Sequence, residues 1–314
     1  MKIGVIGAGA VGAATVTALI RTCDAAAEIV IVDRVGTKAA GLAADTGYAA
    51  ALVSGATVLA GDYHELAGAQ LVIITAGVNE KAGGATDRSD PRGRLVLVPQ
   101  NAAAYAEIVP AVVAAAPDAT LLVVTDPPDP LADLARELAG HDHVVSTGTV
   151  IDSLRFRFHL ARELDVATPD VDAYVLGEHG TSEVFCWSNA TVGGTPVLDV
   201  FAASGRDPAT VRADIESTVR FGNITIIDGI GASQHGIGAV VGRLAHAILS
   251  DEHAVLPVAS FRREYGVTMA LPSVLGAAGV IRTITPKLDD TERELLDKSA
   301  QVLREAATTA LAYR

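Results

Sequence analysis

Two short segments supply side chains that could move a proton and a hydride on a small carboxylic acid. Asp152 and Arg155 lie three residues apart, and His179 lies in the segment Gly-Glu-His-Gly at 177–180. An imidazole titrates near neutral pH, so His179 can both donate and accept a proton. A buried carboxylate such as Asp152 can hold that imidazole in one tautomer. Arg155 can bind a substrate carboxylate through two parallel hydrogen bonds, and helical Asp-x-x-Arg spacing places it on the same face as Asp152.

A glycine-rich segment near the N-terminus predicts a dinucleotide site. It reads G-x-G-x-x-G, follows a strand-like run and opens a helical stretch, and Asp33 ends the next strand-like run. In this context the helix N-terminus binds a pyrophosphate and the acid accepts the ribose hydroxyls. Asp33 would repel a 2′-phosphate, which favours NAD over NADP. The predicted contacts are Gly7, Gly9, Ala10, Val11, Gly12 and Asp33.

The first half of the chain alternates β-branched runs with alanine-rich stretches. Such apolar runs are typical of strands buried on both faces of a parallel sheet. Strands are predicted at 3–6, 29–32, 57–59, 71–75, 121–125 and 144–147, and helices at 11–22, 37–44, 94–116 and 130–139. This βαβ order predicts a Rossmann doubly wound sheet.

The second half predicts a mixed α/β substrate domain. Helices are expected at 153–164, 211–228 and 237–250, strands near 173–176, 190–192, 255–261 and 269–275, and a final helix from Asp290 capped by Asp289 or Asp290. The predicted domains are residues 1–148 and 149–314. The glycine-rich, charged stretch 78–93 follows a strand end, which is typical of a mobile lid over a ligand.

Charge and composition argue against other classes of function. The net charge of −13 disfavours a nucleic-acid partner, which would require a basic face. No run reaches the roughly 18 uncharged apolar residues of a spanning helix, so no membrane partner is expected. The start of the chain lacks the plan of a signal peptide. Cys23 and Cys186 lack metal-ligand spacing, so we expect no metal site and a reduced, cytoplasmic setting.

Taken in order, these motifs closely resemble those of the L-lactate/malate dehydrogenase family over essentially the full length. Further matching segments are Thr75-Ala76-Gly77, Asn101 seven residues after Arg94, Asp126-Pro127-Pro128-Asp129 and Gly231-Ala232-Ser233. The resemblance implies a Rossmann domain, a second α/β domain, a cleft between them, NAD as cofactor, a 2-hydroxy or 2-oxo acid as substrate, and a homodimer or homotetramer.

The resemblance also implies a role for each motif residue. His179 resembles the proton donor and acceptor, Asp152 its orienting carboxylate, and Arg155 the anchor of the substrate carboxylate. Arg94 resembles the loop arginine that polarises the substrate carbonyl and stabilises the developing alkoxide when the lid closes. Ser233 is assigned to the substrate pocket, and Thr75, Ala76, Gly77 and Asn101 to the cofactor.

Departures from the family bear on the substrate. Asp126 replaces the usual asparagine, so it is either protonated or meets a cationic or hydroxylated group. Glu80, third after Gly77, replaces the glutamine common in lactate enzymes and the arginine common in malate enzymes, which disfavours a second carboxylate. The lid loop is longer than usual, so Arg88 or Arg92 could take the place of Glu80. His235 lies at a pocket position that is more often apolar.

The sequence therefore predicts a lactate dehydrogenase-like, NAD-dependent L-2-hydroxy acid dehydrogenase. Its substrate would carry a larger or basic side chain. Malate dehydrogenase is the alternative within the same class. An NAD-binding protein without catalysis on the same fold is the alternative from another class, and the only feature that favours it is Asp126.

Overall fold

One parallel sheet forms the core of the N-terminal half. The computed structural model describes residues 1–22 and 27–314. The parallel strands lie in the order β3-β2-β1-β4-β5-β6, and each overlaps a predicted strand. They are β1 (Lys2–Ile6), β2 (Glu28–Val32), β3 (Thr57–Gly61), β4 (Leu71–Ile74), β5 (Thr120–Val123) and β6 (Val144–Ser146). The Rossmann prediction is confirmed.

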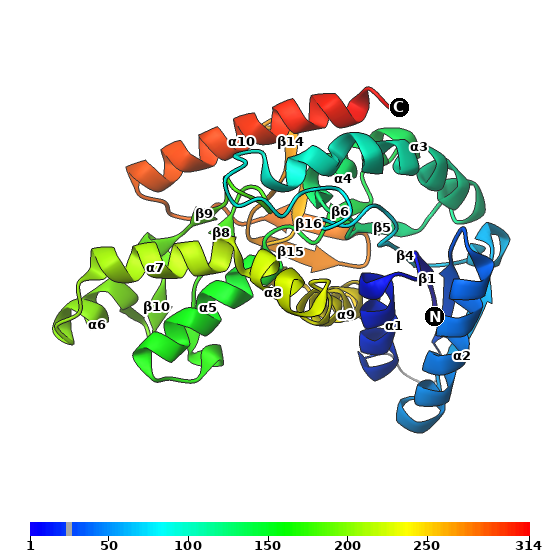
Figure 1. The fold of residues 1–314 in the computed structure, drawn as a ribbon, viewed down its shortest axis with the longest axis horizontal. Coiled ribbons are helices and arrows are strands. Elements are labelled where there is room, and N and C mark those ends of the chain that lie inside the picture. The colour runs from blue at the N-terminus through cyan, green and yellow to red at the C-terminus, as the bar shows by residue number, and fades with distance from the viewer. Residues whose placement is uncertain (23–26) are drawn as a thin grey trace.

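Helices cover both faces of this sheet because its strands are apolar on both sides. Ile3 and Val5 pack toward α1 (Ala10–Thr22), α2 (Gly36–Val53) and α9 (His235–Leu249). Ile6 packs toward α3 (Val98–Ala115), α4 (Pro128–Ala139) and the C-terminal end of α10 (Asp290–Leu311). Figure 1 shows α3, α4 and α10 along one side of the sheet and α1 and α9 along the other.

The C-terminal half adds two strands to the same sheet. β13 (Ala259–Arg262) pairs antiparallel with β6, and β14 (Val267–Ala270) pairs with β13. Each of the two strands predicted at 255–261 and 269–275 is divided in two, because Pro257 and Pro272 cannot donate to a strand ladder. This sheet therefore contains strands from both sides of residue 148. The division of the chain into two domains at that residue stays a prediction.

The remaining strands form small sheets in the C-terminal half. β12 (Ala254–Leu256), β15 (Ser273–Gly276) and β16 (Gly279–Thr283) form one, and β7 (Val171–Asp172), β10 (Thr191–Val192) and β11 (Thr195–Pro196) form another. β8 (Val175–Leu176) pairs with β9 (Val184–Phe185), and the turn between them carries His179.

Several helix boundaries differ from the prediction. The helix predicted at 211–228 is two helices, α7 (Pro208–Arg220) and α8 (Gly222–Ile230), because Phe221 leaves helical geometry with ψ of 10°. α2 runs on past Ala44 because Thr46 and Ala50 are buried. Asp289 caps α10 in a capping box with Glu292, as predicted in outline.

The other helices are α5 (Val150–Leu164) and α6 (Val197–Ala203). Short 3-10 turns are η1 (Tyr63–Leu66), η2 (Gly93–Leu97), η3 (Thr168–Asp170) and η4 (Trp187–Asn189).

Two features bear on the predicted setting of the chain. By length and composition alone, the helical segment Gly93–Ala115 could span a membrane. In the structure this segment packs against η1, α4 and α10 beside the central sheet. Cys186 is buried with a free thiol, whereas Cys23 lies outside the described residues.

Candidate active site

His179 and Asp152 form the central pair of the site. His179 Nδ1 lies 2.5 Å from Asp152 Oδ2, and both side chains are buried. Burial by itself would raise the pKa of Asp152, but the His179 ring and Arg155 outweigh it and hold that pKa at about 2. Burial and the nearby Arg94 guanidinium lower the pKa of His179 despite Asp152. The pair is therefore an ionised carboxylate that orients a neutral imidazole near neutral pH.

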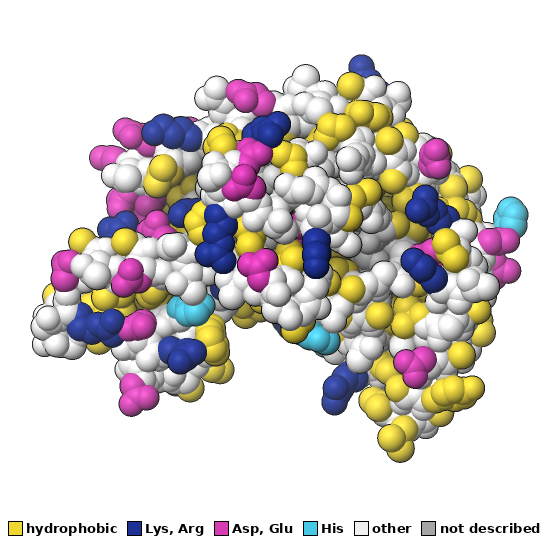
Figure 2. Space-filling model, viewed as in Figure 1, with side chains coloured by type: hydrophobic (Ala, Val, Ile, Leu, Met, Phe, Trp, Pro, Cys, Tyr) yellow, Lys and Arg dark blue, Asp and Glu magenta, His cyan; other side chains and the backbone are white. Residues whose placement is uncertain are grey.

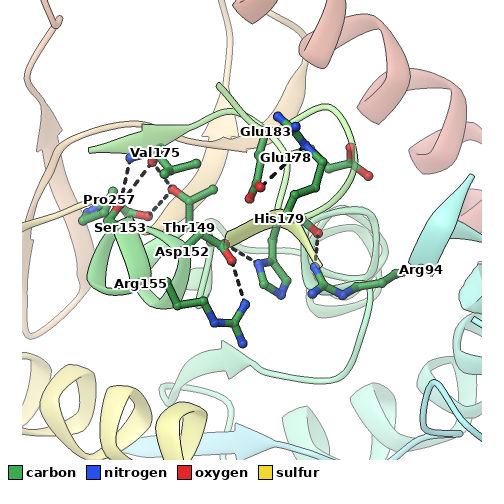
Figure 3. Close-up of polar contacts among 12 residues, drawn as sticks. Arg94, Thr149, Asp152, Ser153, Arg155, Val175, Glu178, His179, Glu183 and Pro257 are labelled. Carbon is green, nitrogen blue, oxygen red and sulfur yellow. Dashed lines mark hydrogen bonds and ion pairs between the residues drawn. The ribbon is translucent and has the colours of Figure 1, made fainter. Parts of the chain in front are cut away.

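The backbone of His179 is fixed as firmly as its ring. Its N–H donates to Asp129 Oδ2 at 2.9 Å, and its carbonyl accepts a hydrogen bond from Arg94 Nη1 at 3.2 Å. Figure 3 shows the imidazole between Asp152 and Arg94. Three different elements, α5, α4 and η2, thus hold one catalytic loop.

Arg155 lies on the same face of α5 as Asp152, as predicted. Its Nη1 donates to Asp152 Oδ1 at 3.2 Å, and the side chain lines the same cavity as His179. The guanidinium has donors left for a second carboxylate, since Arg carries five N–H groups in a fixed fork.

Arg94 and Asp126 meet at the wall of the cavity that His179 lines. Arg94 Nε lies 3.4 Å from Asp126 Oδ2, and Asp126 Oδ1 lies 3.8 Å from His179 Nε2. Burial would lower the pKa of Arg94, but Asp126 and the other nearby carboxylates raise it, so the guanidinium stays charged. Burial raises the pKa of Asp126 well above its ordinary value, and Glu80 adds to that rise against the opposing effect of Arg94.

The lid loop places Glu80, rather than either loop arginine, at the cavity. Glu80 lines the cavity together with Arg94 and Asp126. Arg88 Nη2 instead donates to Thr225 of α8 at 3.1 Å. Arg92 pairs with Asp90 and is 72 % exposed.

In the glycine-rich turn, a side chain would find open space at Gly9 but would clash at Gly7 and Gly12. A Cβ on Gly9 would meet nothing within 4 Å, whereas a Cβ on Gly12 would lie 1.9 Å from the carbonyl of Gly7. Gly7 itself has a φ of +108°, which glycine adopts freely. Asp33 Oδ2 accepts the Ala8 N–H at 2.8 Å, so the acid at the end of β2 lies directly beside this turn. The turn is shaped for close approach of a phosphate at Gly9.

Comparisons with known proteins cover nearly the whole chain. Residues 1–146 match the family described as lactate/malate dehydrogenase, NAD binding domain, and residues 149–313 match its alpha/beta C-terminal domain. The chain belongs to the lactate/malate dehydrogenase family.

Individual members of the family are similar along their full length. An L-lactate dehydrogenase from Deinococcus radiodurans is 43 % identical over 97 % of both chains, and one from Allorhizobium ampelinum is 42 % identical over 98 % of both. A crystal structure of the minor L-lactate dehydrogenase from Enterococcus mundtii superposes with a TM-score of 0.88 at 33 % identity, covering 98 % of both chains. As a member of this family, the protein is an NAD-dependent oxidoreductase of 2-hydroxy acids.

The residues of this dehydrogenase fit NAD at the sheet edge. Thr75 Oγ1 donates to the carbonyls of Ile6 and Gly7 at 3.1 Å each, which joins the β4 end to the glycine turn. Val11, Thr75 and Gly77 line the cavity that also holds His179. Nicotinamide and substrate sites would therefore be continuous.

Asn101 and His235 are among the predicted contact residues that do not line this cavity. Asn101 is fully buried. Its side-chain amide forms hydrogen bonds with the backbone of Val78 and donates to the carbonyl of Asp126, so it holds the segment after β4 against the segment after β5. His235 is exposed at the start of α9 and does not line the cavity, whereas Ser233 does. Within the first turn of α9, Ile237 lines the cavity instead of His235, because side chains two residues apart on a helix point in different directions.

Buried carboxyl groups around the loop that carries His179 were not predicted from the sequence. Asp129 accepts the His179 N–H and the Ser146 hydroxyl, and burial raises its pKa to about 7. Glu183 is buried 3.8 Å from Arg220 Nε. The signal for Asp129 was its place in the first turn of a helix, where a carboxylate is stabilised. Among the described residues, no group of three or more His, Cys, Asp or Glu is arranged to hold a metal ion.

Proposed function

We propose that this protein is a lactate dehydrogenase-like enzyme that interconverts L-2-hydroxy acids and 2-oxo acids carrying a single carboxylate. The position of Glu80 supports this most directly, because Glu80 lines the cavity while Arg88 and Arg92 point elsewhere. A second substrate carboxylate would meet a carboxyl group there instead of a guanidinium, which is electrostatically unfavourable. The similarity to enzymes named L-lactate dehydrogenase points the same way.

Four residues divide the proposed chemistry. Arg155 binds the substrate carboxylate and fixes its orientation. His179 donates a proton to the reacting oxygen during reduction and accepts it during oxidation, while Asp152 keeps the ring oriented. Arg94 stabilises the negative charge that develops on that oxygen in a site shielded from water. When bound, the nicotinamide donates or accepts the hydride.

We further propose that the accepted side chain is neutral or basic. Asp126 and Glu80 both line the cavity, and Arg94 is the cation near them. A guanidinium or ammonium on the substrate would gain from these carboxyl groups, and a larger alkyl group would tolerate them.

A panel of 2-oxo acids assayed with NADH tests this proposal. The panel contains pyruvate, 2-oxohexanoate, 5-guanidino-2-oxopentanoate and oxaloacetate, whose side chains differ in size and charge. We expect oxaloacetate to give the lowest kcat/KM. Glu80→Arg should raise kcat/KM for oxaloacetate by about tenfold or more, because it replaces a repulsive charge with an attractive one. Glu80→Gln is the matched control for loss of charge alone.

The alternatives give different results in the same assay. An optimum with oxaloacetate in the wild-type enzyme would contradict the proposal and favour a malate dehydrogenase. Binding of NADH without turnover of any 2-oxo acid would favour the non-catalytic alternative.

We also propose that the protein is a cytoplasmic homodimer or homotetramer. Apolar side chains gather at one end of α2 (Figure 2), where Tyr48 is 79 % and Leu52 is 90 % exposed. Leu154 and Phe158 are exposed on α5 as well. Contiguous apolar surface of this kind is typical of subunit interfaces. The cytoplasmic assignment rests on the cysteine usage, which fits a reduced compartment.

A further inference from the structure

The cavity holds two acidic side chains where an anion is expected to bind. Asp126 and Glu80 both line it, beside His179 and Arg155. If the proposed function is correct, the substrate brings a carboxylate and a carbonyl oxygen into this space. The inference below rests on that proposed function and concerns how these acids tolerate the substrate.

Asp126 lies where it would meet the reacting oxygen. Its Oδ1 is 3.8 Å from His179 Nε2, and its Oδ2 is 3.4 Å from Arg94 Nε. An oxygen that receives hydrogen bonds from both His179 and Arg94 must lie within reach of this carboxyl. A carbonyl oxygen only accepts hydrogen bonds, and so does an ionised carboxylate. The two groups are therefore compatible only if Asp126 carries a proton.

The surroundings of Asp126 favour such a proton. Its side chain is only 19 % exposed. Burial raises its pKa most strongly, and the nearby carboxyl groups of Glu80 and Asp152 raise it further. Arg94 opposes these effects. Glu80 lines the same cavity, and acidic groups that share one cavity disfavour a further negative charge on Asp126.

We propose that Asp126 carries a proton when a 2-oxo acid is bound. Neutral Asp126 then donates a hydrogen bond to the substrate oxygen beside His179 and Arg94. Glu80 lines the same cavity and favours this neutral form. Asp126 thus acts as a hydrogen-bond donor that is lost as pH rises.

The pH dependence of oxamate binding tests this inference. Oxamate resembles pyruvate but is not reduced, so its dissociation constant from the enzyme–NADH complex reports binding alone. This constant is measured from pH 5 to pH 9 by fluorescence titration for wild type, Asp126→Asn and Glu80→Gln. His179 titrates in all three proteins, so the ratios between their constants isolate the carboxyl pair.

The two variants should move in opposite directions. Asparagine always donates, so the affinity advantage of Asp126→Asn over wild type should grow with pH, by up to about tenfold per pH unit. Glu80→Gln removes the group that keeps the proton on Asp126, so its affinity should begin to fall at lower pH than that of wild type. Asp87→Asn is the control, since it removes a carboxylate from the same loop whose side chain accepts hydrogen bonds from Ser89 in its own turn.

Other outcomes would overturn the inference. A constant ratio between Asp126→Asn and wild type at every pH would show that Asp126 does not change protonation in this range. Parallel profiles for all variants would show the same. If pyruvate is reduced normally while the profiles are parallel, the inference fails and the proposed function stands. If oxamate does not bind and no 2-oxo acid is reduced, the proposed function fails.

Discussion

At the scale of single residues, His179, the proposed catalytic histidine, is held at three points. Asp152 binds its ring, Asp129 accepts its backbone N–H and Arg94 donates to its carbonyl. Each contact comes from a separate part of the chain, so the imidazole is oriented before any substrate enters. Such preorganisation is the main source of rate enhancement in sites of this kind.

Removing the charge of Asp152 should therefore reduce turnover strongly. In Asp152→Asn the amide can donate to His179 Nδ1 and favour the wrong tautomer, so kcat should fall by about 10² to 10⁴-fold. Asp152 also raises the pKa of His179, so the pH limit for reduction should move to lower pH in the variant. Steady-state kinetics over a pH range measure both effects. Asp172→Asn, on the surface, is the control, and a kcat within about threefold of wild type in Asp152→Asn would contradict this role.

Residues in motifs were predicted from the sequence, whereas residues recruited by folding were not. Asp152, Arg155 and His179 follow from residue type and spacing, and the structure brings them together. The relation of Asp129 to His179 spans 50 positions and depends on how α4 meets the β8–β9 turn. His235 is exposed and does not line the cavity, whereas Ile237 two residues later does, so a substrate-binding role for His235 stays a prediction.

At the scale of elements, α4 links the cofactor half to the catalytic loop through a buried carboxyl. Asp129 accepts hydrogen bonds from Ser146 at the end of β6 and from the backbone of His179. Asparagine at 129 could keep both contacts, with its oxygen facing His179 and its amide donating to the Ser146 hydroxyl. The substitution therefore tests the charge of Asp129 without removing the link.

Asp129→Asn should be more stabilising at pH 8 than at pH 5. The ordinary pKa of 3.8 rises to about 7 in the folded state, so the folded protein binds the proton more tightly than the unfolded chain. That stability is fully present below pH 3.8 and is lost as pH rises through about 7. Asp129→Asn has no titrating group at this position, so its free energy of unfolding does not fall for this reason as pH rises. Urea unfolding at pH 5 and pH 8 measures the difference from wild type, with Asp170→Asn as a surface control, and an equal difference at both pH values would contradict the shifted pKa.

Elements were predictable where local patterns decide them. The apolar runs and the glycine turn located β1 to β6 and α1 because both signals act within a few residues. The joining of β13 to β6 was not predictable, since it pairs Ala259 with Ser146 across more than a hundred positions. Tertiary pairing of this kind leaves no local periodicity in the sequence.

At the scale of the whole molecule, the exposed apolar end of α2 bears on assembly. Leu52 is 90 % exposed, which an isolated monomer would leave in water. Light scattering should give a mass of two or four chains for wild type. Leu52→Glu should shift the mass toward a single chain, because it places a charge in the interface. Leu295→Glu on α10 is the matched control, and a wild-type monomer would contradict the proposed oligomer.

One cavity is lined by Val11 of the glycine-rich segment, by His179 and by the acidic residues Glu80 and Asp126. The most direct test of its proposed substrate class is the ratio of kcat/KM for pyruvate to kcat/KM for oxaloacetate, measured with NADH in one buffer at neutral pH. We predict a ratio above about ten in favour of pyruvate, because Glu80 repels a second carboxylate. A ratio in favour of oxaloacetate would contradict the account.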